Sequence, residues 1–407
     1  MVEYGLLGET LGHSFSPQLH RAFGNYDYRL LPTPRDAVAQ LLAERQFRGL
    51  NVTMPYKQMV IPLCDEIDTR AAQIGAVNTI VNRGGRLIGY NTDIDGLLYM
   101  AQRSGIDLHD KKVLILGSGG TSRTAVAAAQ LCGAREIVVI SRNGENNYTN
   151  LHRHTDADCI INTTPVGMFP HCGQSPLDLS QFSHLSGVLD VVYHPLRTAL
   201  FLQAEQLAIP CACGLSMLTA QAKRAAELFT DTTISDDRTE EVLSALRRQL
   251  ENIVLIGMPG CGKSTIADAL AVQTGREVVH LDEIIAQRAG LSIPEIFSQH
   301  GEDYFRALES DCIREVGKRT GIIISTGGGC VTRTENYAPL HQNGRIFHLV
   351  RDCKHLPTDG RPLSQRTDTA TLWAQRKAQY EAFADVVIDN NGTLEQTVAQ
   401  LLQEWNQ

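Results

Sequence analysis

The sequence predicts an α/β protein made of three successive α/β units. Short β-like runs alternate with helical stretches over residues 1–104, and buried-strand runs begin two further units at Val113–Leu116 and Ile253–Ile256. Each of these two runs leads directly into a glycine-rich segment and then into a helix. Strands that alternate with helices are typical of parallel sheets with helices packed on their faces.

The composition limits the class of protein further. The 407 residues suffice for two or three domains of about 150 residues, and 43% hydrophobic with 20% charged residues excludes a disordered chain. The net charge of −8 argues against a nucleic-acid binder. No apolar run approaches the ~18 residues that cross a membrane, and the N-terminus lacks the pattern of an export signal. Ten scattered cysteines include one close pair, Cys211 and Cys213, so we expect a reduced, cytoplasmic protein.

The first unit is predicted to contain short strands joined by helices. Helices are expected at Ser16–Phe23 and Asp36–Arg45, and the alternation predicts a parallel layer. Residues 83–86 (RGGR) form a hairpin turn between the runs Thr79–Val81 and Leu87–Gly89. Further strands are expected at Val2–Leu7, Tyr28–Leu31 and Gly49–Val52.

The junction before the last unit is predicted to be short. Residues 231–238 are polar and turn-like, and Thr239–Glu251 is expected to form a helix that Thr239 caps. The apolar stripe of this helix consists of Val242, Leu243, Leu246 and Leu250. Because the helix leads almost directly into Ile253–Ile256, we predict a domain boundary near residue 251 and a stiff junction.

The segment after Ile253–Ile256 has the pattern of a phosphate-binding loop. Residues 257–265 read GMPGCGKST, which satisfies G-x-x-x-x-G-K-[ST] between a strand and a helix. The glycines allow backbone N–H groups to surround phosphates, Lys263 supplies positive charge, and the Ser264 hydroxyl can bind Mg²⁺. The pattern predicts an ATP site, and the alternative is a glycine-rich turn that caps a helix. The predicted nucleotide-binding residues are Gly260, Cys261, Gly262, Lys263, Ser264 and Thr265.

Further motifs follow this loop in order. They are His280-Leu281-Asp282, YFRALE at 304–309, TGGG at 326–329, GRPL at 360–363, and Arg376-x-x-x-Tyr380. With the loop, they resemble shikimate kinase over nearly all of residues 252–407. The chain departs from the family in two places: the family usually carries an acidic residue where this chain has His280, and the segment leading to Arg361 is short.

The resemblance implies a role for each of these motifs. Asp282 would orient and help deprotonate the accepting hydroxyl, and Lys263 and Arg361, the latter from a mobile lid, would contact the ATP phosphates. The substrate carboxylate would be held by Arg306, Arg376 and the backbone of Gly328 and Gly329. Two guanidinium groups suit a planar carboxylate, and phosphoryl transfer depends mainly on alignment and positive charge. The alternatives are an Arg306–Glu309 helix pair, a solvated Arg376 and a loose glycine turn.

The middle unit contains a variant of the dinucleotide-binding turn. Val113–Leu116 leads into GSGGT at 117–121 and a helix at Thr124–Leu131, with Ser122 in place of the third glycine. The next strand, Ile137–Ile140, ends in Ser141-Arg142-Asn143, where an NAD site usually carries an acidic residue. A cation favours a 2′-phosphate, so NADP(H) is predicted. The alternative is an ordinary strand–helix turn with a surface arginine.

This coenzyme unit is predicted to be reduced in size. Only the short polar stretch Asn143–Thr155 precedes the next apolar run, Ile160–Thr163. One helix and one strand that are usual in such a domain are therefore expected to be missing.

Six motifs surround the coenzyme turn. In order they are GETLGHSFSPQLH (8–20), NVTMPYK (51–57), GAVNT (75–79), NTDIDG (91–96), DVVYHPLRT (190–198) and GLSMLTAQA (214–222). They resemble shikimate dehydrogenase over residues 2–250. The resemblance implies a catalytic pair, Lys57 and Asp93. The implied substrate-binding residues are Ser14, Ser16, Thr53, Asn78, Asp93, Tyr193 and Gln221. The implied NADP-binding residues are Gly117, Ser118, Gly119, Gly120, Thr121, Ser141, Arg142, Val191 and Gly214.

A lysine–aspartate pair suits the reduction of a ketone. Hydride addition develops alkoxide charge, which the Lys57 ammonium stabilises and then protonates while Asp93 anchors it. The Ser, Thr, Asn and Gln side chains suit a polyhydroxylated ring acid. The alternatives are that Asp93 only caps a helix, that Lys57 is a solvated loop residue, and that the two serines cap turns.

Together, the resemblances imply a bifunctional enzyme of aromatic amino acid biosynthesis. The front half would reduce 3-dehydroshikimate to shikimate with NADPH, and the back half would phosphorylate shikimate with ATP and Mg²⁺. The expected domains are a substrate lobe (1–92 with 215–250), an NADP lobe (93–214) and a kinase (251–407). The expected partners are small molecules, with no nucleic acid or membrane, and the oligomeric state stays open. The alternatives are a quinate dehydrogenase fused to a different small-metabolite kinase, and a nucleotide-binding regulatory module without turnover.

Overall fold

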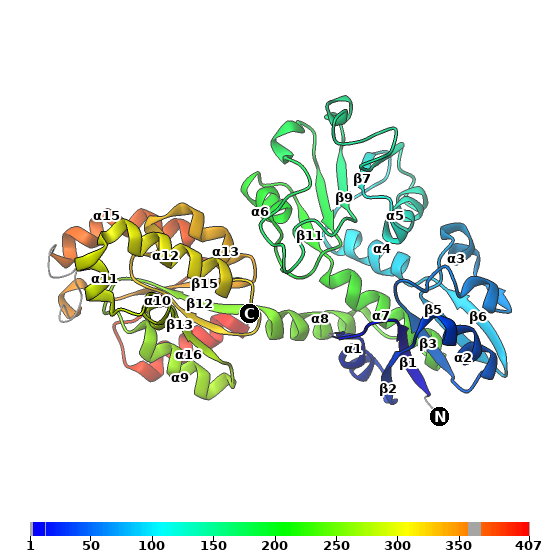
Figure 1. Ribbon diagram of the computed structural model, residues 1–407, viewed down its shortest axis with the longest axis horizontal. Coiled ribbons are helices and arrows are strands. Elements are labelled where there is room, and N and C mark those ends of the chain that lie inside the picture. The colour runs from blue at the N-terminus through cyan, green and yellow to red at the C-terminus, as the bar shows by residue number, and fades with distance from the viewer. Residues whose placement is uncertain (1–2, 13, 357–367, 407) are drawn as a thin grey trace. The chain divides into compact units, whose positions relative to one another are not determined.

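The computed structural model describes residues 3–12, 14–356 and 368–406. The chain divides into two compact units (Figure 1). Unit 1 consists of residues 1–168, 174–193 and 200–246, and unit 2 consists of residues 169–173, 194–199 and 247–407. Each unit has hydrophobic cores of its own. The predicted α/β class is confirmed.

The first sheet of unit 1 has six strands in the order β2-β1-β3-β5-β6-β4. Strand β1 is parallel to β2 and β3, but β5 is antiparallel to both β3 and β6. The predicted hairpin between β5 and β6 is confirmed, whereas the prediction of a parallel layer is wrong for β5, because β4 is again parallel to β6. The strands are β1 (Tyr4–Gly8), β2 (Tyr28–Pro32), β3 (Gly49–Val52), β4 (Glu66–Ile67), β5 (Thr79–Arg83) and β6 (Arg86–Tyr90).

The helices of this region form where the sequence offers an apolar side to bury. Helix α1 has the predicted bounds, Ser16–Phe23, and buries Leu19. Helix α2 (Val38–Glu44) is shorter than predicted, because a 3-10 turn occupies Arg35–Ala37. The other helices are α3 (Thr69–Ile74), α4 (Asp93–Arg103) and α7 (Leu215–Thr230).

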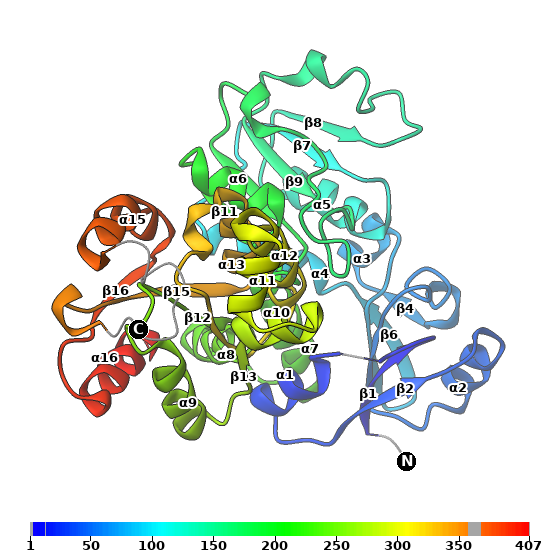
Figure 2. The same cartoon turned by 60° about the vertical axis from the view of Figure 1, so that its left-hand side comes forward.

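The second sheet of unit 1 has five parallel strands in the order β11-β10-β9-β7-β8. Figure 2 shows β8, β7 and β9 side by side. Between β8 and β9 lies only a 3-10 helix, Leu151–His154, so the predicted loss of a helix and a strand is confirmed. The elements are β7 (Lys112–Leu116), α5 (Gly120–Leu131), β8 (Glu136–Ile140), β9 (Cys159–Asn162), β10 (Gly187–Asp190), α6 (Ala199–Gln206) and β11 (Cys211–Cys213).

Helix α8 (Asp236–Leu250) begins earlier than predicted. The Ser235 hydroxyl accepts a hydrogen bond from the Arg238 amide at 3.2 Å, so Ser235, and not Thr239, caps the helix. Asp236 and Asp237 then lie in the first turn, where negative charge is favourable. The predicted apolar stripe is buried, and a single residue, Glu251, separates α8 from the next strand. The stiffness of the junction stays a prediction.

Unit 2 contains a five-stranded parallel sheet in the predicted orientation, in the order β13-β14-β12-β15-β16. Helices α9 and α16 cover one face, and α12 and α13 lie on the other (Figure 1). The strands are β12 (Asn252–Ile256), β13 (Val278–His280), β14 (Ile323–Ser325), β15 (Gly344–Val350) and β16 (Val386–Asp389). The helices are α9 (Lys263–Thr274), α10 (Leu281–Ala289), α11 (Ile293–Gln299), α12 (Gly301–Val316), α13 (Tyr337–His341), α15 (Thr369–Phe383) and α16 (Leu394–Asn406).

Among the described residues, no helix combines the length and the apolar character needed to span a membrane.

Candidate active sites

The predicted pair in unit 1 forms a direct ion pair. Lys57 lies in the loop after β3, and Asp93 is the first residue of α4. The Lys57 Nζ lies 2.6 Å from Asp93 Oδ2, and Asn78 Nδ2 donates to the other oxygen, Oδ1, at 2.9 Å. The Asp93 carboxylate is thus engaged with these two side chains and does not cap α4. The side chains of Lys57 and Asp93 keep 24% and 14% of their surface exposed, which is enough for a substrate to contact them.

A buried polar network holds this pair in place. Asn78 Nδ2 also donates to Thr92 Oγ1 at 3.0 Å, and Asn78 Oδ1 accepts from the Thr92 amide at 2.7 Å. Thr92 Oγ1 in turn lies 3.5 Å from Gln221 Oε1 on α7. The network therefore joins Gln221 to the lysine–aspartate pair across three elements. Thr92 was not predicted to have a role, although its motif, NTDIDG, is visible in the sequence.

The other predicted substrate-binding residues come from three places: Ser14 and Ser16 lie at the start of α1, Thr53 follows β3, and Tyr193 follows β10 of the second sheet. The Ser14 hydroxyl donates to Ser16 Oγ at 3.1 Å, and the ring of Phe15 between them meets the ring of Tyr193 edge-on, with centroids 6.2 Å apart. Burial raises the pKa of Tyr193, so its hydroxyl stays protonated and can donate. Thr53 follows β3, and its amide donates to Leu7 O at 2.9 Å.

The predicted coenzyme residues gather at the carboxyl edge of the second sheet. Gly117–Gly119 connect β7 to α5, and Gly120 and Thr121 begin that helix. Ser141 and Arg142 follow the neighbouring strand β8, with Arg142 exposed. A Cβ added at Gly119 or Gly120 would enter open space at the N-terminus of α5, which leaves room for a phosphate. Ligands usually bind at this edge of a parallel sheet.

Val191 and Gly214 complete this edge from β10 and β11. Their backbones pack so closely that a Cβ on Gly214 would lie 2.0 Å from Val191 O. The two residues predicted to lie near the nicotinamide therefore form one surface, and only glycine fits at position 214.

The phosphate-binding loop of unit 2 is closed around its own lysine. Lys263 Nζ donates to the carbonyls of Gly257 at 2.9 Å and Met258 at 3.1 Å. Gly260 and Gly262 have positive φ, as the inward-turned loop requires, and α9 begins directly at Lys263. Ser264 is exposed, and its Oγ lies 3.5 Å from Ser325 Oγ on β14. The oxygen donors at Ser264 and Ser325 fit a hard cation such as Mg²⁺.

The residues predicted to bind the kinase substrate come together beside this loop. Arg306 is buried on α12, and its NH1 donates to Glu309 Oε2 at 2.7 Å. The glycine segment packs against it, because a Cβ on Gly329 would lie 2.0 Å from Arg306 NH2. Arg376 is also buried, and its NH1 donates to Gly328 O at 3.1 Å. The Arg306–Glu309 pair within the helix, which is the alternative explanation for Arg306, is thus present, and it forms part of a larger cluster.

Two carboxyl groups in this cluster have unusual environments. The protein packed around Asp282 removes part of its hydration and raises its pKa, although Lys263 and Arg306 oppose this shift and the side chain keeps access to solvent. Burial also raises the pKa of Glu309, against the opposing charge of Arg306. A carboxyl such as Asp282, close to positive groups and partly desolvated, can orient a hydroxyl and accept its proton.

Two contacts that support the loop were not predicted from the sequence. Asn390 Nδ2, after β16, donates to Cys261 O, and the Tyr380 hydroxyl donates to Gly328 O. Tyr380 stands in a noted motif without an assigned role, whereas nothing in the sequence distinguishes Asn390. The predicted lid residue, Arg361, lies outside the described residues.

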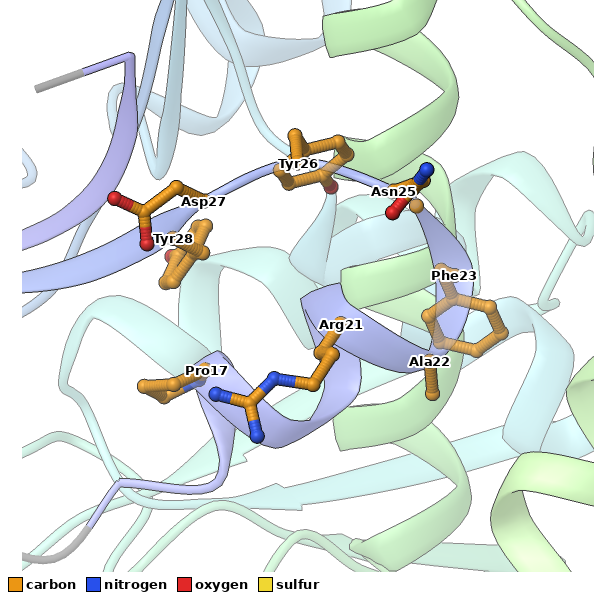
Figure 3. A pocket seen from close by; sticks show the side chains of 9 residues that line it. Pro17, Arg21, Ala22, Phe23, Asn25, Tyr26, Asp27 and Tyr28 are labelled. Carbon is orange, nitrogen blue, oxygen red and sulfur yellow. The ribbon is translucent and has the colours of Figure 1, made fainter.

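A separate recess of about 620 Å³ lies on unit 1 at the end of α1 (Figure 3). It is lined by Pro17, Arg21, Ala22, Phe23, Gly24, Asn25, Tyr26, Asp27 and Tyr28. None of these residues belongs to a predicted site.

Two protein-family models match the chain. The model of the shikimate dehydrogenase substrate binding domain matches residues 6–80, and the model of shikimate kinase matches residues 259–406.

Relatives match the first part of the chain over nearly their whole length. The NADP(+) shikimate dehydrogenase of Clostridium perfringens (strain SM101 / Type A) is 32% identical over 268 residues, which cover 61% of this chain and 99% of the relative. The crystal structure of a chorismate mutase/shikimate 5-dehydrogenase fusion protein from Clostridium acetobutylicum has a TM-score of 0.58 at 31% identity, covering 60% of this chain and 96% of that one. Shikimate 5-dehydrogenase from Thermus thermophilus, in complex with NADP(H) and shikimate, has a TM-score of 0.55 at 30% identity, covering 60% and 99%.

Proposed function

The chain belongs to the shikimate dehydrogenase family over its first part and carries a shikimate kinase domain after it, and we propose that it catalyses both reactions in succession. It is a bifunctional enzyme of the shikimate pathway. We propose that unit 1 reduces 3-dehydroshikimate to shikimate with NADPH, and that unit 2 phosphorylates the 3-hydroxyl of shikimate with ATP. The Lys57–Asp93 pair carries the first assignment, because it supplies the proton donor that ketone reduction needs.

In the reduction, Lys57 would stabilise the charge that develops on the carbonyl oxygen and then donate its proton to that oxygen. Asp93 holds the ammonium at 2.6 Å, and Asn78 fixes the other carboxylate oxygen. NADPH supplies the hydride when it is bound. The N-terminus of α5 and the open space at Gly119 and Gly120 would receive its pyrophosphate, and the exposed Arg142 would face its 2′-phosphate.

In the phosphorylation, Asp282 would orient the accepting hydroxyl and take its proton. Lys263 lies close enough to influence the pKa of Asp282, so the phosphate loop and the acceptor site adjoin. Arg306 and Arg376 would bind the substrate carboxylate together with the backbone of Gly328 and Gly329. Mg²⁺, held at Ser264, would neutralise phosphate charge when it is bound.

We also propose a functional division of the chain. Residues 1–92 and 215–250 would form the substrate lobe, residues 93–214 the NADP lobe and residues 251–407 the kinase. The separate sheets built from residues 4–90, 112–213 and 252–389 support this division.

A one-pot assay tests both activities and their order. With 3-dehydroshikimate, NADPH and Mg·ATP, we expect NADPH absorbance to fall and ADP to form. Without NADPH, we expect no ADP, because the kinase would lack its acceptor until the ketone is reduced. Added shikimate should restore ADP formation in that sample.

Other results would favour the alternatives. No ADP with saturating shikimate, despite measurable ATP binding, would indicate a regulatory module. Faster turnover of quinate with NAD⁺ than of shikimate with NADP⁺ would indicate a quinate dehydrogenase.

A further inference from the structure

His280 lies beside the phosphate loop, and the reaction described above gives it no role. It is the last residue of β13, and its register partner on the neighbouring strand is Ser325. The Ser325 hydroxyl lies 3.5 Å from the hydroxyl of Ser264, the residue proposed to bind Mg²⁺. His280 therefore lies at the carboxyl end of the parallel strands, where the proposed cation site also lies.

A carboxylate on α9 holds the imidazole ring. His280 Nε2 lies 3.0 Å from Asp268 Oδ1. Asp268 follows Ser264 by four residues on α9, so the two side chains lie one above the other on the same helix face. The ring of His280 thus contacts the helix face that carries the Ser264 hydroxyl one turn away.

The hydrogen bond to Asp268 determines the state of the other ring nitrogen. An ionised carboxylate only accepts hydrogen bonds, so Nε2 carries a proton, and in the neutral ring Nδ1 has a free lone pair. Nδ1 is buried and has no hydrogen-bond partner among the described residues. His280 occupies the N-cap position of α10, but its side chain does not cap the helix. Capping of α10 therefore does not explain why Nδ1 is buried at this position.

Metal-binding histidines commonly show this arrangement. One ring nitrogen donates to a carboxylate, which fixes the tautomer and the ring orientation, and the other nitrogen binds the metal. The described residues contain no cluster of three His, Cys, Asp or Glu side chains suited to a metal. A cation here would thus take few protein ligands and complete its shell with phosphate oxygens and water, as cations at nucleotide sites do.

We propose that His280 Nδ1 is a direct ligand of the divalent cation that accompanies the nucleotide, with Asp268 as its positioning residue. This rests on the proposed kinase function. An imidazole suits transition metals better than Mg²⁺, and affinities for nitrogen sites rise from Mn²⁺ to Co²⁺. The site therefore favours Mn²⁺ and Co²⁺ relative to Mg²⁺ more than an all-oxygen site would.

Pulsed EPR of the full-length protein with Mn²⁺ and ADP tests the bond itself. We expect a nitrogen coupling from a bound imidazole, which changes its pattern when the protein is labelled with ¹⁵N-histidine. The coupling should disappear in His280→Gln and persist in the matched control His300→Gln, an exposed histidine on the same unit. Bound Mn·ADP without the coupling would overturn the proposal and leave the kinase function standing.

Calorimetric titration of metal–ADP binding tests the preference. We expect the ratio of Co²⁺ to Mg²⁺ affinity to fall in His280→Asp, which replaces nitrogen by oxygen. Loss of the positioning carboxylate in Asp268→Ala should weaken Co·ADP binding about tenfold and change Mg·ADP binding little. Unchanged ratios in both variants would overturn the proposal. Absence of any ADP binding by the wild-type chain would overturn the kinase function and this ligand with it.

Discussion

Gly214 illustrates how one residue constrains the proposed coenzyme site. Its φ of −64° is accessible to any residue, so conformational freedom does not explain a glycine there. The lack of space explains the glycine, because a Cβ would lie 2.0 Å from the Val191 carbonyl oxygen. By contrast, a Cβ at Gly119 would meet no atom within 4 Å.

These two glycines give a matched pair of variants. Gly214→Ala should destabilise the protein by about 1–3 kcal/mol, since the backbones must move apart. Gly119→Ala creates no clash and should cost less stability than Gly214→Ala, with only the weaker N-cap preference of alanine against it. It should weaken NADPH binding, because its methyl group would occupy the space proposed for the pyrophosphate. Denaturant midpoints and NADPH fluorescence titrations measure the two effects. Wild-type stability of Gly214→Ala would contradict the packing argument.

The raised pKa of Asp282 predicts a pH dependence. The carboxylate is the active form, so kinase kcat/KM should fall as pH drops through a pKa above the ordinary value of 3.8. Since the folded protein binds this proton more tightly than the unfolded chain does, ionisation of Asp282 lowers stability as pH rises. Asp282→Asn should therefore lose kinase activity and yet raise the denaturation midpoint at neutral pH. A lower midpoint would contradict the direction of the shift.

Helix α8 shows which parts of an element its sequence specifies. Its apolar stripe is visible in the sequence, and all four stripe residues are buried. Its start was predicted three residues late, because Thr239 and Ser235 are both good caps and only the folded chain shows which hydroxyl meets a free amide. Thr239 Oγ1 instead donates to Ser235 O within the helix, at 3.2 Å.

Removal of the Ser235 cap should destabilise α8. Ser235→Ala leaves the Arg238 amide without its acceptor, and we expect a loss of about 1 kcal/mol. Ser244→Ala, in the interior of the same helix, is the matched control and should be neutral or slightly stabilising. Denaturant unfolding compares the two variants. Equal stabilities would show that another group caps the helix.

Sheet topology was predictable only where it depends on local sequence. The β5–β6 hairpin follows from its short glycine turn, and parallel order in unit 2 follows from the strand–helix alternation. The antiparallel pairing of β3 with β5 brings together strands that a helix and a short strand separate, and no local pattern records it. Likewise, the contact of Asn390 with Cys261 O spans 129 positions, so the phosphate-loop motif does not include it.

At the scale of the whole molecule, the two proposed reactions use separate sets of residues. The lysine–aspartate pair lies in unit 1, and the phosphate loop with its acceptor cluster lies in unit 2. Each set is supported by hydrogen bonds within its own unit. The activities should therefore be separable by single substitutions in the intact chain.

Two lysine variants test this independence. Lys57→Ala should lower dehydrogenase turnover at least about a hundredfold, because the proton donor is lost, and spare phosphorylation. Lys263→Ala should have the reverse effect. Both activities are measured on the same preparations, as NADP⁺ reduction with shikimate and as ADP release. Loss of both activities in either variant would contradict separate sites.

The bonds from Lys263 to Gly257 and Met258 have a consequence for ligand association. A solvated lysine loses side-chain entropy when it becomes ordered, at a cost of about 1.5–2 kcal/mol. In the folded protein, two backbone carbonyls of the phosphate loop already hold the Lys263 ammonium. An arriving phosphate replaces two carbonyl oxygens as the partner of an ammonium that is already in place. The side-chain entropy of Lys263 is therefore lost when the protein folds, and ATP binding does not include this loss.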